Sequence, residues 1–195
     1  MKSLLTRSAV VATGAAALIG AGAVAAWATI TPGSTAVTVT STSLKFSGTI
    51  NGTAVTVTCT SASIGFTTPA SGNGPVNTSL PVISGCTDTL GGSDTITPSG
   101  TWQIAANSSP TQVKLTIPQN GATFTTSAIA GCSIKASPSG STTVTAAYVN
   151  PTSAPPNGRA TFTNVSVPFA GTGCTVTSPG KMTGVFTPNT PVTIS

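Results

Sequence analysis

The chain alternates apolar and polar residues over short runs, and clusters of glycine, proline and asparagine separate these runs. The clearest example is residues 44–59, LKFSGTINGTAVTVTC, where Asn51-Gly52 stands between two alternating segments. Asn-Gly is the strongest short signal for a two-residue type I′ turn, because both central residues need a positive φ. We therefore predict a β-hairpin over residues 44–59.

A two-residue turn also predicts the register of this hairpin. Counting back from the turn pairs Phe46 with Val57, and residues directly opposite point to the same face. Lys45 and Thr56 are then expected on the outer face. The inner face would be apolar, and its residues are Leu44, Phe46, Ile50, Val55, Val57 and Cys59.

Similar runs continue along the chain. Further strands are predicted at residues 36–40, 64–66, 80–86, 101–106, 112–117, 122–126, 129–136, 143–149, 160–169, 174–176, 182–186 and 192–194. Near Asn164 and Val165 the alternation shifts by one residue, which indicates a β-bulge. No segment after residue 28 has a 3.6-residue period. We therefore predict an all-β, antiparallel β-sandwich of about a dozen short strands, immunoglobulin-like or Greek-key in type.

The amino-terminal segment has the features of a signal peptide. Lys2 and Arg7 form a basic start, residues 9–26 are small and apolar, and Ala26-Trp27-Ala28 fits a cleavage site. The alternative is a membrane anchor, which the weak hydrophobicity of this Ala/Gly-rich stretch disfavours. We expect residues 1–28 to be removed, leaving a secreted, extracellular domain at residues 29–195 that does not span the membrane.

Residues 87–100, TDTLGGSDTITPSG, are the most polar and turn-rich stretch inside this domain. They are interpreted either as a long loop or as a joint between two halves of the domain.

The four cysteines are Cys59, Cys86, Cys132 and Cys174. In an exported protein, four cysteines indicate two disulfides, and three pairings are possible. We favour Cys59–Cys86 and Cys132–Cys174, because each closes a loop within one half of the chain. A zinc site is disfavoured, since the chain has no histidine and no C-x-x-C spacing.

Composition supports an ordered domain. Thr supplies roughly a fifth of the chain, and β-branched residues favour pleated strands. After the predicted cleavage, five Lys and Arg stand against Asp88 and Asp94, a net charge of +3. The cations are spread one to each strand-sized segment, whereas nucleic-acid binders cluster them. A nucleic-acid partner is therefore not expected.

Groups for acid–base catalysis are scarce. The chain has no His and no Glu, and its only carboxylates are Asp88 and Asp94. General acid–base hydrolysis needs paired groups of tuned pKa, and a serine nucleophile needs a base beside it. We expect no enzyme activity, no catalytic residues and no cofactor.

Two sets of residues remain as candidate binding groups. Asp88 and Asp94, with Thr89 and Ser93, are candidate calcium ligands, although Asp and Gly are also ordinary turn formers. Trp102 and Tyr148 are candidate ligand-binding residues if their rings are exposed, and core residues otherwise. Trp102 has the parity of its apolar neighbours, which favours the core.

The leader, the Thr/Ser/Gly bias and the segment Gly100-Thr-Trp-Gln-Ile104 resemble uncharacterised secreted β-rich proteins of high-GC Gram-positive bacteria. This resemblance implies export and a β-rich fold, and it implies no activity. The chain can also be compared with neocarzinostatin-type chromophore carriers, which are small secreted sandwiches with two disulfides. We assign no binding residues from that comparison. This chain is longer than those carriers and lacks their short-range cysteine spacing.

Two functions are therefore carried forward. The first is a secreted, non-catalytic extracellular or cell-envelope-associated protein with a structural or interaction role. Its partner would be a cell-wall or surface component. The alternative is a small-ligand or carbohydrate-binding β-sandwich carrier. An apolar cavity of a few hundred Å³ would favour the carrier, and a filled core would favour the first function.

Overall fold

The computed structural model describes residues 28–195, except for residues 72–73, 108 and 110. These residues form sixteen β-strands and no helix, which confirms the predicted all-β class. In this described part, therefore, no helix has the length and apolar character needed to cross a membrane. Of the predicted signal peptide, only Ala28 falls among the described residues.

The strands vary from two-residue pairs to the long β4 and β15. In chain order they are β1 (Ile30–Thr31), β2 (Ala36–Ser41), β3 (Leu44–Ile50), β4 (Thr53–Thr67), β5 (Val76–Asn77), β6 (Val82–Asp88), β7 (Ser93–Pro98), β8 (Gln103–Ala106), β9 (Gln112–Ile117), β10 (Ala122–Thr126), β11 (Ser133–Ala136), β12 (Thr142–Val149), β13 (Arg159–Val167), β14 (Phe169–Thr172), β15 (Val176–Pro188) and β16 (Thr193–Ile194).

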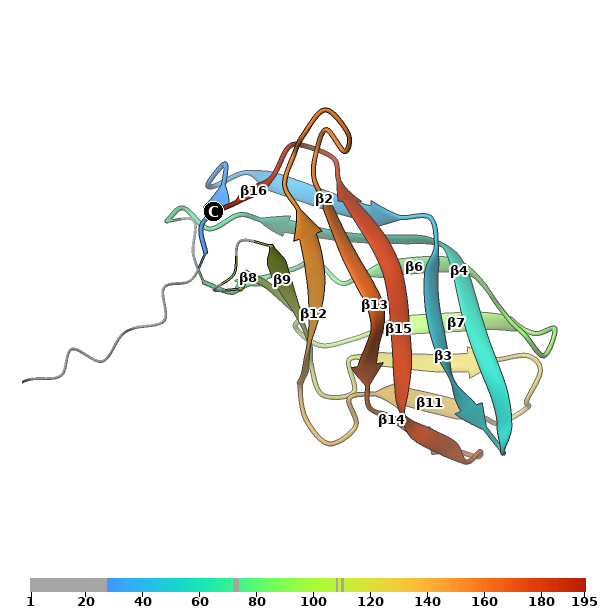
Figure 1. Ribbon diagram of the computed structural model, residues 1–195. Helices are drawn as coiled ribbons and strands as arrows, with labels where there is room; N and C mark the ends of the chain where they lie inside the picture. Colours follow the sequence, from blue (N-terminus) through green and yellow to red (C-terminus); the bar gives the residue numbers. More distant parts are fainter. Residues whose placement is uncertain (1–27, 72–73, 108, 110) are drawn as a thin grey trace, which may run out of the picture.

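The strands form two layers that cross one another. In Figure 1, β3, β12, β13 and β15 run steeply down the front, whereas β2, β6, β7 and β11 run across the view behind them. β4 belongs to both layers, because residues 53–59 pair with β3 and residues 62–67 pair with β2. The predicted sandwich is thus made largely by one fourteen-stranded sheet that bends over on itself.

At one end of the molecule, the path of paired strands closes into a ring. The order β14-β11-β10-β7-β6-β4 continues through β3 to β15 and then to β13. β13 runs through Pro168 directly into β14, where the path began. The amide of Phe169 also donates a hydrogen bond to Ser178 Oγ at 3.0 Å and ties β14 to β15. This ring encloses one end of the core.

The β3–β4 hairpin has the predicted register. Phe46 lies opposite Val57, Leu44 lies opposite Cys59, and the tight turn is at Asn51-Gly52. Both turn residues have a positive φ, 50° and 82°, as a type I′ turn requires. Leu44 and Val57 are buried, as expected, but Phe46 is only half-buried. Phe46 is thus on the predicted inner face but only partly buried, because it lines a pocket at the end of the sandwich.

The bulge predicted in the segment after residue 160 is present in β13. Pairing with β15 shifts between Phe162 and Val165, and Asn164 has a φ of 49°. In two places, segments predicted as separate strands belong to one longer strand. The segments predicted at 53–59 and 64–66 are one strand, β4, and those at 174–176 and 182–186 belong to β15. In β15 the pairing with β3 shifts register between Thr177 and Lys181, so the alternation is interrupted although the strand continues.

Residues 87–100 are not a long loop. They contain the end of β6, a tight turn and all of β7, and Thr87 pairs with Ser93 across the turn. The Gly91-Gly92 pair lets the chain reverse within a few residues, and Gly91 has a φ of 86°. This segment is therefore a hairpin within the large sheet.

The core between the layers is apolar and includes aromatic contacts. The rings of Phe46 and Phe124 meet edge to face with centroids 4.9 Å apart, and Phe124 meets Phe169 in the same way at 5.5 Å. Such edge-to-face contacts add to the burial of the rings themselves. The three phenylalanines come from β3, β10 and β14, so they join the two layers across the ring.

Candidate functional site

A pocket lies inside the ring, near the tip of the β3–β4 hairpin. Its volume is about 50 Å³. One water molecule needs about 10–15 Å³ of such space, so the pocket holds a few waters. The walls are mostly apolar, and two carboxylates lie among them. Residues that line it include Phe46, Ile50, Val55, Val57, Asp88, Asp94, Phe124, Thr126, Cys132, Ile134, Phe169 and Val176.

Asp88 organises the β6–β7 turn. Its Oδ1 accepts hydrogen bonds from the amides of Leu90 and Gly92, both at 2.8 Å, and its Oδ2 accepts one from Thr126 Oγ1 of β10. Burial raises the pKa of Asp88, but these hydrogen bonds outweigh it and hold the pKa below its ordinary value. Asp88 is therefore an ionised residue with a structural role in this turn.

Asp94 stands at the start of the neighbouring strand, opposite Cys86 on one side and Thr126 on the other. Its Oδ2 is buried and has no hydrogen-bond partner among the described residues. Burial and the nearby charge of Asp88 raise the pKa of Asp94 to about 6. The two carboxylates beside the pocket thus differ, because one is stabilised as an anion and the other is stabilised in its protonated form.

The arrangement around this pair does not resemble a calcium site. Thr89 Oγ1 accepts a hydrogen bond from the amide of Thr56, and Ser93 Oγ contacts Ser127 Oγ. Neither hydroxyl therefore joins a ligand set with Asp88. Within the described ranges, no cluster of three or more His, Cys, Asp or Glu residues is present. The observed hydrogen bonds make Asp88 a turn former.

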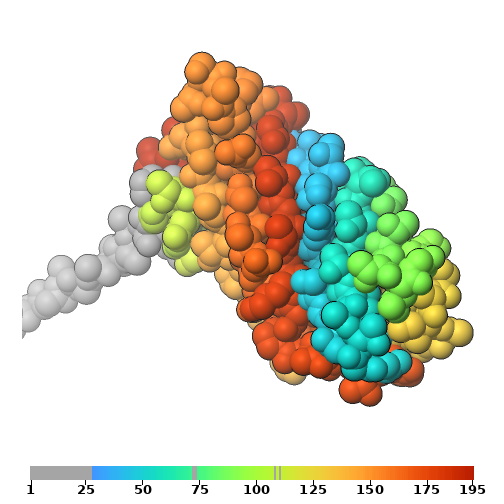
Figure 2. All heavy atoms as spheres, turned by 45° about the vertical axis from the view of Figure 1, so that its right-hand side comes forward, coloured from blue at the N-terminus to red at the C-terminus, as the bar shows by residue number. Residues whose placement is uncertain are grey.

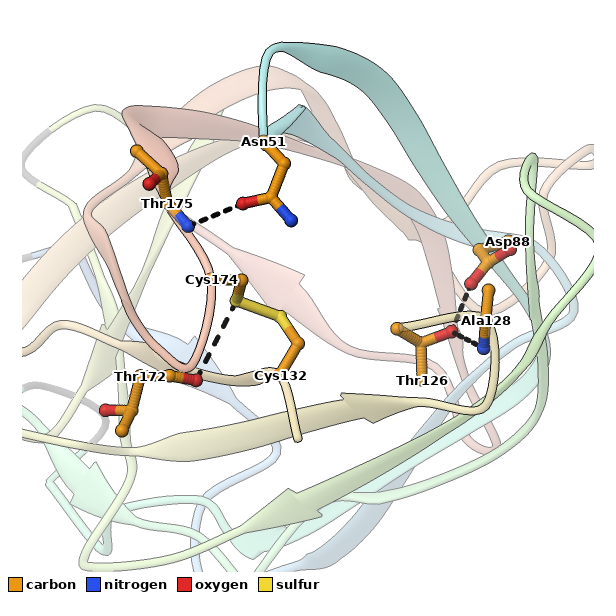
Figure 3. The surroundings of a disulfide bond; sticks show 8 residues. All are labelled: Asn51, Asp88, Thr126, Ala128, Cys132, Thr172, Cys174 and Thr175. Atoms are coloured by element: carbon orange, nitrogen blue, oxygen red, sulfur yellow. Dashed lines mark hydrogen bonds between the residues drawn. A yellow bond between two sulfur atoms is a disulfide. The ribbon is translucent and has the colours of Figure 1, made fainter. Parts of the chain in front are cut away.

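Both disulfides join the predicted partners. Cys59 and Cys86 lie directly opposite on β4 and β6, with Cα atoms 3.9 Å apart. Cys132 and Cys174 have Cα atoms 5.2 Å apart and join the segments that precede β11 and β15. Figure 3 shows the second disulfide across from the Asp88–Thr126 contact. The Cys132–Cys174 bridge thus helps to hold the end of the ring where the pocket lies.

The hairpin turn is fastened to the same end of the molecule. The backbone N–H of Asn51 donates a hydrogen bond to Thr175 O at 2.8 Å, and the backbone N–H of Thr175 donates one to Asn51 Oδ1 at 2.8 Å. Figure 3 shows this contact beside the disulfide. The sequence indicated the turn but not this second role of Asn51, because Thr175 is 124 residues away.

Trp102 and Tyr148 lie in the core, each 6% exposed. Trp102 Nε1 donates to Ser99 O at 3.0 Å, and the Tyr148 hydroxyl donates to Val192 O at 2.6 Å. Burial raises the pKa of Tyr148 to about 12. Neither ring offers a free face on which a sugar could stack, and both polar ends are already hydrogen-bonded.

Two further cavities lie deeper in the described core. One, about 50 Å³, is lined by residues that include Tyr148, Phe162 and Phe186, and the other is about 30 Å³ and borders Trp102. Drug-sized ligands occupy pockets of about 300–1,000 Å³. The core is therefore largely filled by its own side chains.

Comparison with known proteins identifies no relative. No protein-family model matches the chain, and neither a curated protein nor a solved structure is significantly similar to it.

Proposed function

We propose that the mature chain works outside the cytoplasm as a non-catalytic protein with a structural or interaction role, at the cell surface or in the surrounding medium. The observation that carries this proposal is a largely filled core that is cross-linked by two disulfides. One of these disulfides joins directly opposed residues of β4 and β6. Disulfides persist in oxidising compartments outside the cytoplasm. The small volume of the cavities favours a role for the outer surface over a carrier role.

The chemistry of the chain supports a non-catalytic role. The sequence has neither His nor Glu. Of its two carboxylates, Asp88 is committed to a turn through hydrogen bonds from Leu90, Gly92 and Thr126. Acid–base catalysis needs groups that are free to exchange protons with a substrate. Asp94 is the one carboxylate with an unpaired oxygen among the described residues, and no second titratable group of similar pKa stands beside it.

Fractionation of the producing cells tests this proposal. We expect the protein in the culture medium or the cell-wall fraction, with an intact mass that begins at Thr29 and lacks four hydrogens for its two disulfides. The amide of Thr29 donates to Ser195 O at 2.7 Å. Cleavage before Thr29 therefore preserves the pairing of the two ends. Recovery of reduced, uncleaved protein from the cytoplasm would contradict the proposal.

The second candidate, a small-ligand carrier, is favoured by one observation. The pocket at the end of the ring combines apolar walls with Asp88 and Asp94. With a volume of about 50 Å³, it suits only a few heavy atoms. Thermal shifts with short-chain alkyl amines test this function, since an amine would pair with the carboxylates. A rise in melting temperature that Asp94→Asn abolishes would favour the carrier.

A further inference from the structure

The strand register places two lysines of different strands beside each other on the outer surface. Lys45 of β3 lies opposite Thr183 of β15, and Lys181 of β15 lies opposite Ser47 of β3. Met182, between Lys181 and Thr183, is buried, so its two neighbours point outward. Lys45 and Lys181 are therefore diagonal neighbours on one face, about 7 Å apart between Cβ atoms.

Hydroxyl side chains surround these lysines. Lys181 Nζ donates a hydrogen bond to Ser166 Oγ of β13 at 2.8 Å, which leaves two of its three protons for a ligand. Thr58 of β4 lies opposite Lys45. Within the described residues, Lys45 Nζ has no hydrogen bond or ion pair. We name this surface the cationic face, and its residues are Lys45, Thr58, Ser166, Lys181 and Thr183.

Both carboxylate side chains point to the opposite side of the sheet. Asp88 lies opposite the buried Val57, and Asp94 lies opposite the buried Cys86. Because directly opposed residues share a face, these carboxylates face the pocket. The chain has no other Asp or Glu. No acidic side chain therefore opposes an anion that approaches the cationic face.

The cationic face continues along β13 towards Arg159, which is exposed. At about 3.3 Å per residue, Arg159 lies roughly 20 Å from Ser166. Figure 2 shows this surface, with β15 in red between β13 in orange and the blue-to-cyan segment that includes β3. A close pair of lysines with a third cation roughly 20 Å further along the same face suits an extended polymer that carries acidic groups at intervals.

The chemistry of the cationic face favours a polysaccharide over a nucleic acid. Single-stranded nucleic acids bind proteins by stacking on exposed aromatic rings and along dense rows of cations. Every Phe, Trp and Tyr among the described residues is buried or half-buried. Hydroxyl and ammonium groups instead match the hydroxyls and carboxylates of a sugar chain through charge-assisted and neutral hydrogen bonds.

We infer that the cationic face binds an acidic polysaccharide, with Lys45 and Lys181 pairing its carboxylates and Thr58 and Ser166 contacting its hydroxyls, whereas the Thr183 hydroxyl is held by Asn164. This inference deepens the proposed interaction role and rests on it. It names the class of partner that the surface fits.

Binding of the purified, disulfide-bonded protein to alginate tests the inference, with neutral dextran and double-stranded DNA as comparisons. We expect binding to alginate that weakens as salt is raised, and no binding to dextran. The double variant Lys45→Gln/Lys181→Gln should bind about tenfold more weakly and show a shallower salt dependence. Arg159→Gln should have a smaller effect in the same direction.

Lys135→Gln is the control for the loss of a positive charge elsewhere on the surface. Lys135 is exposed on β11 in the other layer, opposite Thr123, so its loss removes one charge away from the cationic face. Its binding should stay within about twofold of the parent. Equal binding by the double variant and the control, equal binding to dextran, or tighter binding to DNA than to alginate would overturn the inference. Fractionation measures the location of the protein separately. A failure to bind alginate would therefore leave the proposed location outside the cytoplasm unaffected.

Discussion

Truncation of Phe46 is the most direct test of the hairpin register and of the core built on it. Phe46→Ala removes a half-buried ring that lies opposite Val57 and meets Phe124 edge to face at 4.9 Å. Removing a fully buried phenylalanine costs about 3–5 kcal/mol. Phe46 already borders a small cavity and part of its ring is exposed. We therefore expect a loss of about 2–3 kcal/mol in the free energy of unfolding.

Part of this loss should come from the contact with Phe124. An edge-to-face pair contributes about 0.5–1.5 kcal/mol beyond its buried area. A double-mutant cycle with Phe46→Leu and Phe124→Leu should therefore give a coupling energy of about 1 kcal/mol. This measurement separates the ring–ring contact from burial alone.

Urea unfolding followed by fluorescence provides the assay. With a slope of about 2 kcal/mol per molar urea, the expected loss for Phe46→Ala lowers the midpoint by roughly 1 M. Lys45→Ala, one residue away and exposed, should change stability by less than about 0.5 kcal/mol. Equal and small losses for Phe46→Ala and Lys45→Ala would refute the register, and the inner face of the hairpin would have to be reassigned.

Three further predictions concern the turn, the disulfides and the carboxylate pair. Replacing Asn51-Gly52 by Ala-Ala should destabilise the protein in urea melts by about 2 kcal/mol, because Ala resists a positive φ and the Asn51 Oδ1 bond to Thr175 is lost; no change would show that neither feature stabilises the fold. Changing Cys132 and Cys174 together to Ser should lower stability by about 4 kcal/mol in the chain-entropy model. Removing Cys59–Cys86 should lower it slightly less, because those cysteines are 27 rather than 42 residues apart. A urea midpoint that neither replacement changes would contradict this prediction. The pKa of Asp94 is raised to about 6 from 3.8, so the folded state binds its proton more tightly than the unfolded state, and stability should rise as pH falls from about 7 to 4. Asp94→Asn should remove this dependence and stabilise the protein at pH 7 by about 1 kcal/mol, after allowance for solvent screening of a partly exposed group. The pKa of Asp88 is lowered, so the stabilisation from its ionised form should be present at neutral pH and be lost only as pH falls below about 4. Thermal melts between pH 3 and 8 check both residues. A melting temperature of the parent that does not change over this range would count against the raised pKa of Asp94.

Local features of the sequence predicted the local structure well. The Asn51-Gly52 turn and its register follow from two flanking runs with period 2, and both signals lie within sixteen residues. The bulge near Asn164 was visible as a phase shift for the same reason. Such features are readable because each depends on neighbours along the chain.

The candidate site could not be predicted in the same way. Thr126 reaches Asp88 across 38 residues, and Thr175 reaches Asn51 across 124. The sequence presented Asp88 and Asp94 as two possible metal ligands, but their contacts depend on which strand lies beside β7. Alternation shows which residues share a face of one strand, and it carries no information about the neighbouring strand.

The same limit applies to the surface. Along the sequence, Lys45 and Lys181 are isolated cations in separate segments. They become neighbours because β15 pairs with β3, and both carboxylates turn inward because of the register of β6 and β7. Sheet order and register arise from the packing of the whole core. Charge clustering across strands is therefore a property of the folded sheet, whereas turn type, strand phase and the hairpin register are already present in the chain.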